Sequence, residues 1–256
     1  MKVKSEECKI LDIQKISENG FILSLKTEKF INKFLPGNFI QIKCSEENTI
    51  LRRPFSVLDE NDGILKVYFK SVGKGTNWLA NRIISETVNI IAPLGNSYDF
   101  DSKKEILLIG GGCGISPLYF LSKFLKEKNN KVDALFGFKD KNEQPTIITE
   151  NIKKNIDNLW ITLDETEENY KGNVSDFLKN LELDKYDGFY CCGPAKMLKS
   201  INKYLKGKNS QVSLEARMGC GIGICYGCSI ITSKGNKRVC IDGPVFNMNE
   251  VIWDEL

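Results

Sequence analysis

Histidine is missing from the chain, which has 256 residues. A Rieske iron–sulfur centre needs histidine ligands, so that class of centre is excluded, together with any catalysis by imidazole. An excess of one charge is missing too, because 36 basic side chains stand against 33 acidic ones and the net charge is +3. This balance, with the lysines scattered along the sequence, argues against a nucleic-acid-binding protein.

Long apolar runs are also absent, and no stretch approaches the ~20 residues of a membrane-spanning helix. The first residues, MKVKSEECKILDIQ, contain neither the apolar core nor the cleavage site of a signal peptide, so we expect a cytoplasmic protein without membrane association. In a reducing compartment the nine cysteines serve as metal ligands or core residues. Hydrophobic residues make up 41% of the chain, enough for the cores of two ordinary domains.

Four of the cysteines lie in one glycine-rich stretch, EARMGCGIGICYGCSIITSKGNKRVC at 215–240. Cys220, Cys225 and Cys228 have the C-x4-C-x2-C spacing of plant-type [2Fe–2S] sites, and Cys240 follows a predicted hairpin. The intervening glycines let a loop wrap tightly around a cluster. A zinc site usually has two short C-x2-C units, and disulfides are unexpected in a reducing compartment. The pattern therefore favours an iron–sulfur cluster over these two alternatives.

Short runs of alternating apolar and polar residues fill the first hundred positions and predict a small antiparallel β-barrel. The expected strands are 9–16, 21–26, 39–44, 51–58, 64–70 and 88–91, and one helix is expected at 76–85.

Two motifs in this region are suited to a flavin dinucleotide. In RPFS, at 53–56, the guanidinium can pair with a pyrophosphate, the ring can cover an isoalloxazine and the hydroxyl can hydrogen-bond the flavin edge. Farther on, a glycine and a threonine open the expected helix, where free N–H groups attract phosphate. A core phenylalanine and an ordinary helix cap are the alternatives. The candidate residues are Arg53, Pro54, Phe55, Ser56, Gly75 and Thr76.

From residue 105 onward the pattern alternates between strands and helices, which predicts a parallel sheet with helices on both faces. Ligands of such sheets bind at the carboxyl ends of the strands. The expected strands are 106–109, 132–137, 159–163, 188–192 and 211–214, and the expected helices are 117–128, 146–156, 175–181 and 195–206.

The loop GGGCGISP, at 110–117, follows the first of these strands and is the natural dinucleotide site. It departs from G-x-G-x-x-G because Pro117 replaces the last glycine, so a structural tight turn is the alternative. A second turn, CGP at 192–194, ends another strand. Neighbours on a strand face opposite ways, so we expect Cys191 in the core and Cys192 toward the crevice. The candidate residues for this nucleotide are Gly112, Gly114, Ser116, Gly193 and Pro194.

These motifs, in this order, resemble the ferredoxin–NADP reductase superfamily. With the cysteine stretch included, nearly the whole chain is similar to the family of electron-transfer subunits of NAD-linked, class 1B dihydroorotate dehydrogenase. The resemblance implies a multidomain α+β protein. It would have an FAD-binding antiparallel β-barrel at 1–98, an α/β parallel-sheet domain for NAD at 99–214 and a small [2Fe–2S] segment at 215–256.

The resemblance also implies roles for single residues. It adds Tyr68, Phe69 and Lys70 to the FAD site and makes Cys220, Cys225, Cys228 and Cys240 the cluster ligands. The superfamily commonly has tyrosine where Phe55 stands, so here the ring can stack on the flavin without donating a hydrogen bond. Cys192 and Glu215 are candidates for the nicotinamide site; their alternatives are a core thiol and a surface carboxylate. Residues 139–143 carry both charges, so the preference for NAD over NADP comes from the family.

The implied activity belongs to pyrimidine biosynthesis. An FMN-containing dihydroorotate dehydrogenase catalytic subunit, in a heterotetramer of two subunits of each kind, would oxidise dihydroorotate, and electrons would pass through [2Fe–2S] and FAD to NAD⁺. One alternative is a stand-alone NAD(P)H reductase feeding ferredoxin, an oxygenase or a hydrogenase. Related reductases of that kind often place aspartate where Cys220 stands, which argues against it. The other alternative is a zinc-binding protein without a redox role.

Overall fold

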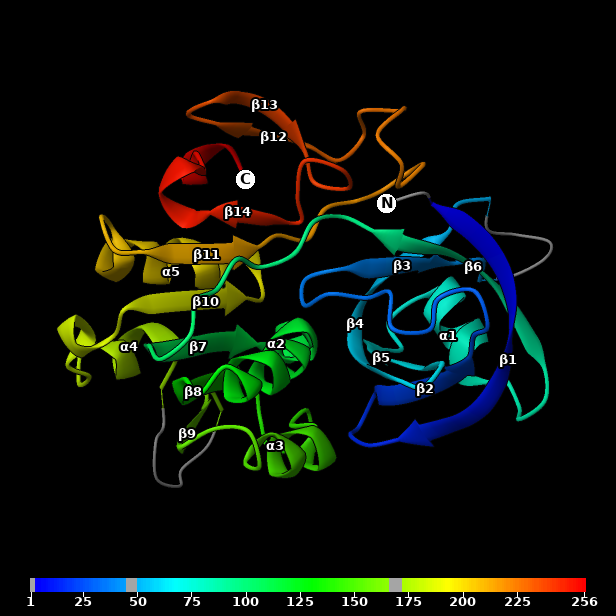
Figure 1. Ribbon diagram of the computed structural model, residues 1–256, viewed down its shortest axis with the longest axis horizontal. Coiled ribbons are helices and arrows are strands. Elements are labelled where there is room, and N and C mark those ends of the chain that lie inside the picture. The colour runs from blue at the N-terminus through cyan, green and yellow to red at the C-terminus, as the bar shows by residue number, and fades with distance from the viewer. Residues whose placement is uncertain (1–2, 45–49, 166–171) are drawn as a thin grey trace.

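The computed structural model describes residues 3–44, 50–165 and 172–256. Figure 1 shows a barrel on one side, a sheet with helices on the other, and the C-terminal segment lying across the top of both. Within the described ranges no helix has the length and apolar character to cross a membrane.

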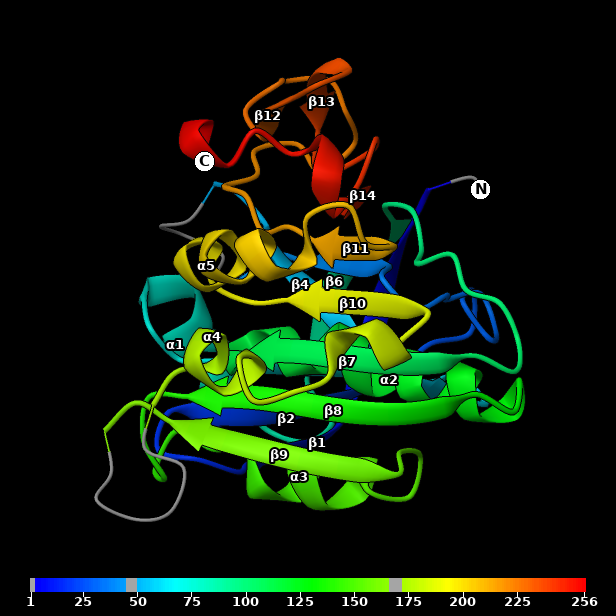
Figure 2. The ribbon, with the colours of Figure 1, turned by 90° about the vertical axis from the view of Figure 1, so that its left-hand side faces the viewer.

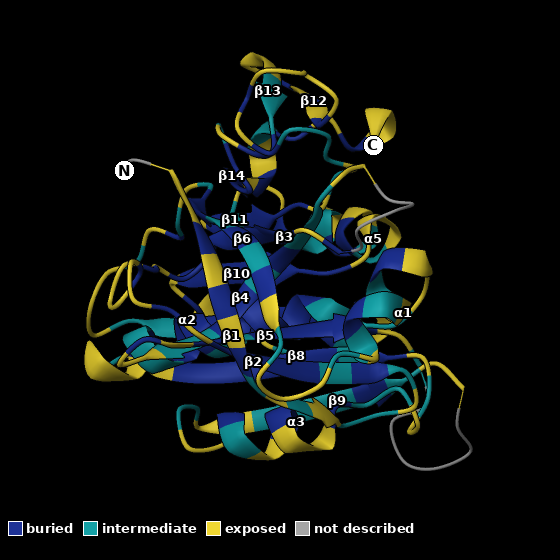
Figure 3. Cartoon of the chain, turned by 90° about the vertical axis from the view of Figure 1, so that its right-hand side faces the viewer, coloured by how far each residue is buried: buried dark blue, intermediate teal, exposed yellow. Residues whose placement is uncertain are grey.

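Six strands close the N-terminal barrel in the order β1-β2-β5-β4-β3-β6, with antiparallel pairing throughout. Along β1 buried and exposed residues alternate, as Figure 3 shows, because one side of the strand faces the barrel core. All six predicted strands are present, but their limits differ: β1 begins five residues earlier than predicted, β3 ends two residues earlier, and β4 and β6 each end three residues later. The elements are β1 (Lys4–Lys15), β2 (Gly20–Lys26), β3 (Phe39–Ile42), β4 (Arg53–Asn61), β5 (Ile64–Lys70), α1 (Lys74–Ala80) and β6 (Thr87–Leu94).

The second sheet has the order β14-β11-β10-β7-β8-β9 and is parallel except for β14, which pairs antiparallel with β11. Its strands are β7 (Glu105–Gly111), β8 (Lys131–Phe138), β9 (Asn158–Leu163), β10 (Gly188–Cys192), β11 (Ser210–Ser213) and β14 (Val245–Asn247). The α+β prediction is confirmed. The edge strand β14 was not predicted, and it comes from the C-terminal segment.

Helices cover both faces of this sheet (Figure 2). Helices α2 and α3 pack on the face that carries Ile106 and Leu108, whereas α4 and α5 pack on the face that carries Leu107 and Ile109. Cys191 and Cys192 point to these opposite faces, as the alternation along the strand predicted. The helices are α2 (Ile115–Glu127), α3 (Thr146–Ile152), α4 (Val174–Leu178) and α5 (Ala195–Leu205).

Three helices end several residues earlier than predicted, and one of them, expected at 175–181, ends at Leu178. The helix expected at 76–85 ends at Ala80, because the following residues turn back toward β1: Ser85 has φ 79° and donates its N–H to Ile10 O. The helix expected at 146–156 ends at Ile152. Asp157 N–H donates to Val132 O at 2.6 Å, so the chain must already be turning into β9.

The C-terminal segment contains the predicted hairpin, formed by β12 (Ser229–Thr232) and β13 (Gly235–Arg238). Short 3-10 turns follow at Met248–Glu250 and Trp253–Glu255. Asn96 ties this segment to the end of the barrel: its Oδ1 accepts Val245 N–H at 2.9 Å and its Nδ2 donates to Val245 O at 2.8 Å. The domain limits 1–98, 99–214 and 215–256 stay a prediction.

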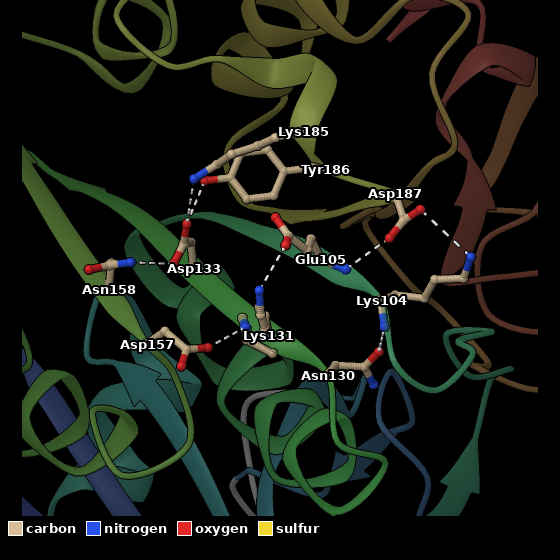
Figure 4. A network of polar contacts seen from close by, with 11 residues as sticks. Lys104, Glu105, Asn130, Lys131, Asp133, Asp157, Asn158, Lys185, Tyr186 and Asp187 are labelled. Atoms are coloured by element: carbon tan, nitrogen blue, oxygen red, sulfur yellow. Dashed lines mark hydrogen bonds and ion pairs between the residues drawn. The ribbon is translucent and has the colours of Figure 1, made fainter.

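A buried carboxylate, Asp133, organises the amino ends of β8 and β9 (Figure 4). Its Oδ2 accepts hydrogen bonds from the Tyr186 hydroxyl at 2.6 Å and from Lys185 Nζ at 3.2 Å. Its Oδ1 accepts a hydrogen bond from Asn158 Nδ2 at 2.8 Å. A carboxylate can be buried at low cost only when it is bonded in this way. The network lies at the end of the sheet opposite to the predicted ligand sites.

We predict that Tyr186→Phe lowers the free energy of unfolding by about 1.5–3 kcal/mol, the usual contribution of a hydrogen bond to a charged group. Urea-induced unfolding of the holoprotein measures the change. Tyr204→Phe is the matched control, because among the described residues the Tyr204 hydroxyl makes no hydrogen bond. Equal midpoints for the two variants would contradict the role given to Tyr186.

Candidate functional site

A pocket of about 490 Å³ opens where the barrel, the carboxyl ends of the parallel strands and the start of the C-terminal segment meet. This volume suits a small-molecule ligand or part of a larger cofactor. Eight of the residues predicted from the sequence line it: Pro54, Phe55, Ser56, Tyr68, Phe69, Lys70, Ser116 and Glu215. The two halves of the chain therefore bring their candidate residues to one place.

The barrel side of the pocket is aromatic. Phe55 meets Phe69 edge to face, with ring centroids 5.6 Å apart, and Phe21 stacks on Phe69 at the same distance. Flat apolar walls of this kind suit an isoalloxazine ring. Phe39 and Val72 also line the pocket and were not predicted, because Phe39 has the pattern of an ordinary core residue of a strand and Val72 lies in the exposed segment after β5.

Arg53, Gly75 and Thr76 lie beside the pocket rather than on its lining. A Cβ at Gly75 would be 3.4 Å from Arg53 Nε, so the glycine lets the guanidinium approach the start of α1. Thr76 Oγ1 accepts the N–H groups of Val72 and Gly73, at 3.0 and 3.1 Å, and so caps the helix. The cationic group and the helix start are adjacent, as a pyrophosphate would require.

On the opposite side the Gly112–Gly114 turn connects β7 to α2 and packs on the end of β10. A Cβ at Gly114 would lie 2.6 Å from Gly193 N, so only glycine allows these two turns to touch. Cys192 is buried behind this contact and is not among the described residues that line the pocket. Cys113 does line the pocket, although it was not among the candidate residues named from the glycine loop.

Two charged side chains that line the pocket are Lys70 and Glu215. Lys70 Nζ bonds Glu143 Oε2 at 2.7 Å, and this ion pair joins β5 to the loop after β8. Glu215 is open to solvent at the mouth of the pocket, yet protein surrounds it on most sides, and this burial raises the pKa of its carboxyl. Burial, with Glu215 nearby, also raises the pKa of Cys113 to about 12, so this thiol stays neutral.

The four predicted ligand cysteines form two pairs. Cys220 and Cys225 each donate their backbone N–H to the other's Sγ at 3.4 Å, on the exposed side of the loop. Cys228 and Cys240 are buried, and Cys240 N–H donates to Cys228 Sγ at 3.4 Å. All nine cysteines are free thiols, which removes the disulfide alternative.

The pairing fits a [2Fe–2S] cluster better than a zinc ion. Each iron of such a cluster takes two thiolates, whereas zinc needs its ligands to converge on one point. Among the described residues no three cysteine or carboxylate side chains converge in that way. Left-handed backbone occurs at Gly221, with φ 70°, and at Gly223, with φ 82°, so the role predicted for the glycines is confirmed there.

Backbone N–H groups surround the Cys220 sulfur. Ile222, Ile224 and Cys225 donate to it at 3.5, 3.3 and 3.4 Å. Burial acts in the opposite direction, but these donors outweigh it and hold the pKa of the Cys220 thiol at about 6. The loop therefore stabilises the thiolate that a metal ligand must be.

Arg238 braces this loop from the hairpin. Its Nη1 donates to Gly223 O at 2.8 Å, its Nε pairs with Asp242 Oδ2 at 3.2 Å, and its guanidinium lies 5.0 Å from the centre of the Tyr226 ring. Around the loop, four apolar side chains are exposed, and we call them the cluster rim: Ile222, Ile224, Tyr226 and Ile241.

The architecture matches known reductases. The NADH-dependent reduced ferredoxin–NADP oxidoreductase, a structure described for flavin-based electron bifurcation, has a TM-score of 0.87 and 30% identity, covering 97% of this chain and 91% of its own. A ferredoxin NADP⁺ reductase from Neisseria gonorrhoeae shares the fold at 16% identity and a TM-score of 0.66. Barrel, sheet and cysteine loop thus define an iron–sulfur flavoprotein of the ferredoxin–NADP reductase type.

Within this class of iron–sulfur flavoproteins, the chain matches a narrower family. Residues 215–252 match the iron–sulfur cluster binding domain of dihydroorotate dehydrogenase B. The electron transfer subunit of dihydroorotate dehydrogenase B (NAD(+)) from Shouchella clausii is 31% identical over 98% of this chain and all of its own length. Its counterpart from Clostridium perfringens is 34% identical over 95% of this chain and 96% of its own. The chain belongs to this family of electron transfer subunits.

Several predictions from the sequence are thereby confirmed: the family resemblance, the oxidoreductase function in electron transfer, and FAD and [2Fe–2S] as cofactors. The roles of the individual site residues stay predictions.

We predict that Arg238→Ala releases the loop and speeds loss of the cluster roughly tenfold, the lower range for residues that orient metal ligands. Visible absorbance under a chelator would follow the loss. Arg82→Ala is a matched control, since Arg82 also pairs with a carboxylate four residues on, Glu86, and lies over the Trp78 ring. Equal rates of cluster loss in the two variants would show that Arg238 does not hold the cysteine loop in place.

Proposed function

We propose that this chain carries electrons from an FMN-containing, dihydroorotate-oxidising catalytic subunit to NAD⁺, and so serves pyrimidine biosynthesis in the cytoplasm. The observation that supports this most directly is that an aromatic pocket lies next to a four-cysteine loop. The short segment 215–220 connects the two. When bound, FAD links the single electrons of an iron–sulfur cluster to the hydride of a nicotinamide. The protein's own task is then to bind, orient and shield these groups.

Within the pocket we assign the flavin ring to the aromatic wall of Phe55 and Phe69, with Ser56 at its edge. Arg53, with Gly75 and Thr76, is assigned to the pyrophosphate. The support is the closeness of the guanidinium to the start of α1 and the position of both beside the pocket. Pro54, Tyr68 and Lys70 complete the barrel side of the proposed FAD site.

For NAD we assign the Gly112–Gly114 turn, Ser116 and the Gly193–Pro194 turn, because they lie together at the carboxyl ends of β7 and β10. Glu215 is placed at the nicotinamide because it projects into the same pocket as the flavin wall. Cys192 is buried behind the contact between these two turns, and we assign it the role of supporting them. The relatives' name, which includes NAD(+), supports NAD over NADP.

The catalytic subunit is proposed to dock on the cluster rim, in a complex with two subunits of each kind. Exposed apolar side chains grouped around a redox centre are typical of a protein interface, and they shorten the path to the partner's cofactor. A second function, a stand-alone reductase for ferredoxin, is favoured by the similarity to the ferredoxin–NADP oxidoreductase. Co-purification separates them: an FMN-containing partner supports the first, and an active chain without one supports the second.

We predict that Cys225→Ser loses the cluster and stops electron transfer to the partner, while FAD stays bound and is still reduced by NADH. A serine hydroxyl is a much poorer iron ligand than a thiolate. Iron content, flavin content and coupled dihydroorotate-to-NAD turnover are the measurements. Cys8→Ala serves as control, because Cys8 is a buried thiol of the barrel core. Full coupled turnover in Cys225→Ser would disprove the ligand assignment.

We predict that Glu215→Gln slows flavin reduction by NADH roughly tenfold, the loss of about one charge-assisted hydrogen bond. The ionised carboxylate accepts that bond, and burial raises its pKa. As pH falls through this raised pKa, the wild-type rate should therefore drop, whereas the variant's rate should not. Stopped-flow absorbance measures both profiles. Glu127→Gln, at the exposed end of α2, is the control; parallel pH profiles for wild type and Glu215→Gln would remove Glu215 from the nicotinamide site.

A further inference from the structure

Gln41 occupies an unexpected place for a polar side chain. It stands on β3 between Ile40 and Ile42, whose side chains fill the barrel core, so the alternation of the strand directs Gln41 outward. The C-terminal segment covers the barrel at this point, and Gln41 is 0% exposed. An amide without access to water must find its hydrogen bonds inside the protein.

Two residues of the C-terminal segment contact this amide. Nε2 lies 4.0 Å from Met218 Sδ, which is a weak acceptor. At Gly221 the approach is closer, because an added Cβ would lie 2.5 Å from Gln41 Cδ and 2.8 Å from Oε1. The amide therefore rests directly against the Gly221 backbone. Within the described residues Oε1 has no hydrogen-bond partner.

These contacts place Gln41 between the two cofactor sites. Phe39, two residues earlier on β3, lines the pocket, and so do Met218 and Pro54, the partner of Gln41 on β4. Gly221 follows the ligand Cys220 directly, and the next peptide carries the Ile222 N–H that donates to Cys220 Sγ. The Gln41 amide thus packs directly beside the peptide that carries one donor to this sulfur.

We propose that Gln41 is a positioning residue for the iron–sulfur cluster. Its carboxamide holds the Gly221–Ile222 peptide from the barrel side and, through that peptide, sets the reduction potential of the cluster. Hydrogen bonds to ligand sulfurs raise the potential, because they stabilise the reduced form with its extra negative charge. The inference rests on the proposed assignment of Cys220 as a ligand.

Gln41→Leu tests the proposal, since leucine fills similar space and has no polar group. We expect its cluster to have a lower midpoint potential, by about a tenfold change in the one-electron equilibrium, which corresponds to about 59 mV. An anaerobic redox titration followed by EPR measures this value, and the FAD potential from the same titration is an internal reference that should not move. Gln41→Glu places a negative charge at the loop and should lower the cluster potential at least as far.

Gln14→Leu makes the same change at an exposed position of β1 and is the matched control. Loss of the cluster in Gln41→Leu, with FAD content and melting temperature retained, also supports the proposal. Full iron content with unchanged cluster potentials in both Gln41 variants overturns it. It is equally overturned if both variants lose FAD and cluster together and melt at lower temperature, because Gln41 would then be a core residue only. Iron and sulfide analysis of the unaltered protein tests the ligand assignment separately.

Discussion

Backbone N–H groups directed at one sulfur atom govern the shape of the C-terminal segment. For three amides to point at Cys220 Sγ, the chain must curl back on itself within five residues. That path needs left-handed backbone at Gly221 and Gly223, which glycine adopts without steric cost. Two supports hold this curl in place: Arg238 on the side of the hairpin, and the barrel on the other side.

The segment also completes both other parts of the molecule. It covers the outer face of β3, supplies Glu215 and Met218 to the pocket, and adds β14 to the parallel sheet. Chain segments far apart in sequence therefore meet at one place, and the pocket is formed only where they meet. A relay that must place two cofactors close together gains from such an arrangement, because rigid packing fixes their separation.

Much of this could be predicted from the sequence. The cysteine spacing predicted four ligands, because the spacing itself reflects how a loop wraps a cluster, and the structure brings these four cysteines together in two pairs. The barrel and the parallel sheet followed from their periodicities, and the turns around Gly75 and Gly114 from their glycines. Gln41 could not be found in this way, because the strand pattern predicts that an outward residue is exposed to solvent. It does not reveal that the C-terminal segment covers this residue. Strand β14 is only three residues long and has no periodicity to detect.

The edge strand has a consequence for biosynthesis. Because β14 is formed by Val245–Asn247, β11 gains its neighbour on that side only after the cysteine segment between the two strands has been synthesised. The cysteine loop lies between β11 and β14 and is anchored at both ends by the same sheet. The cysteine loop is therefore held at both ends only after β14 has paired with β11.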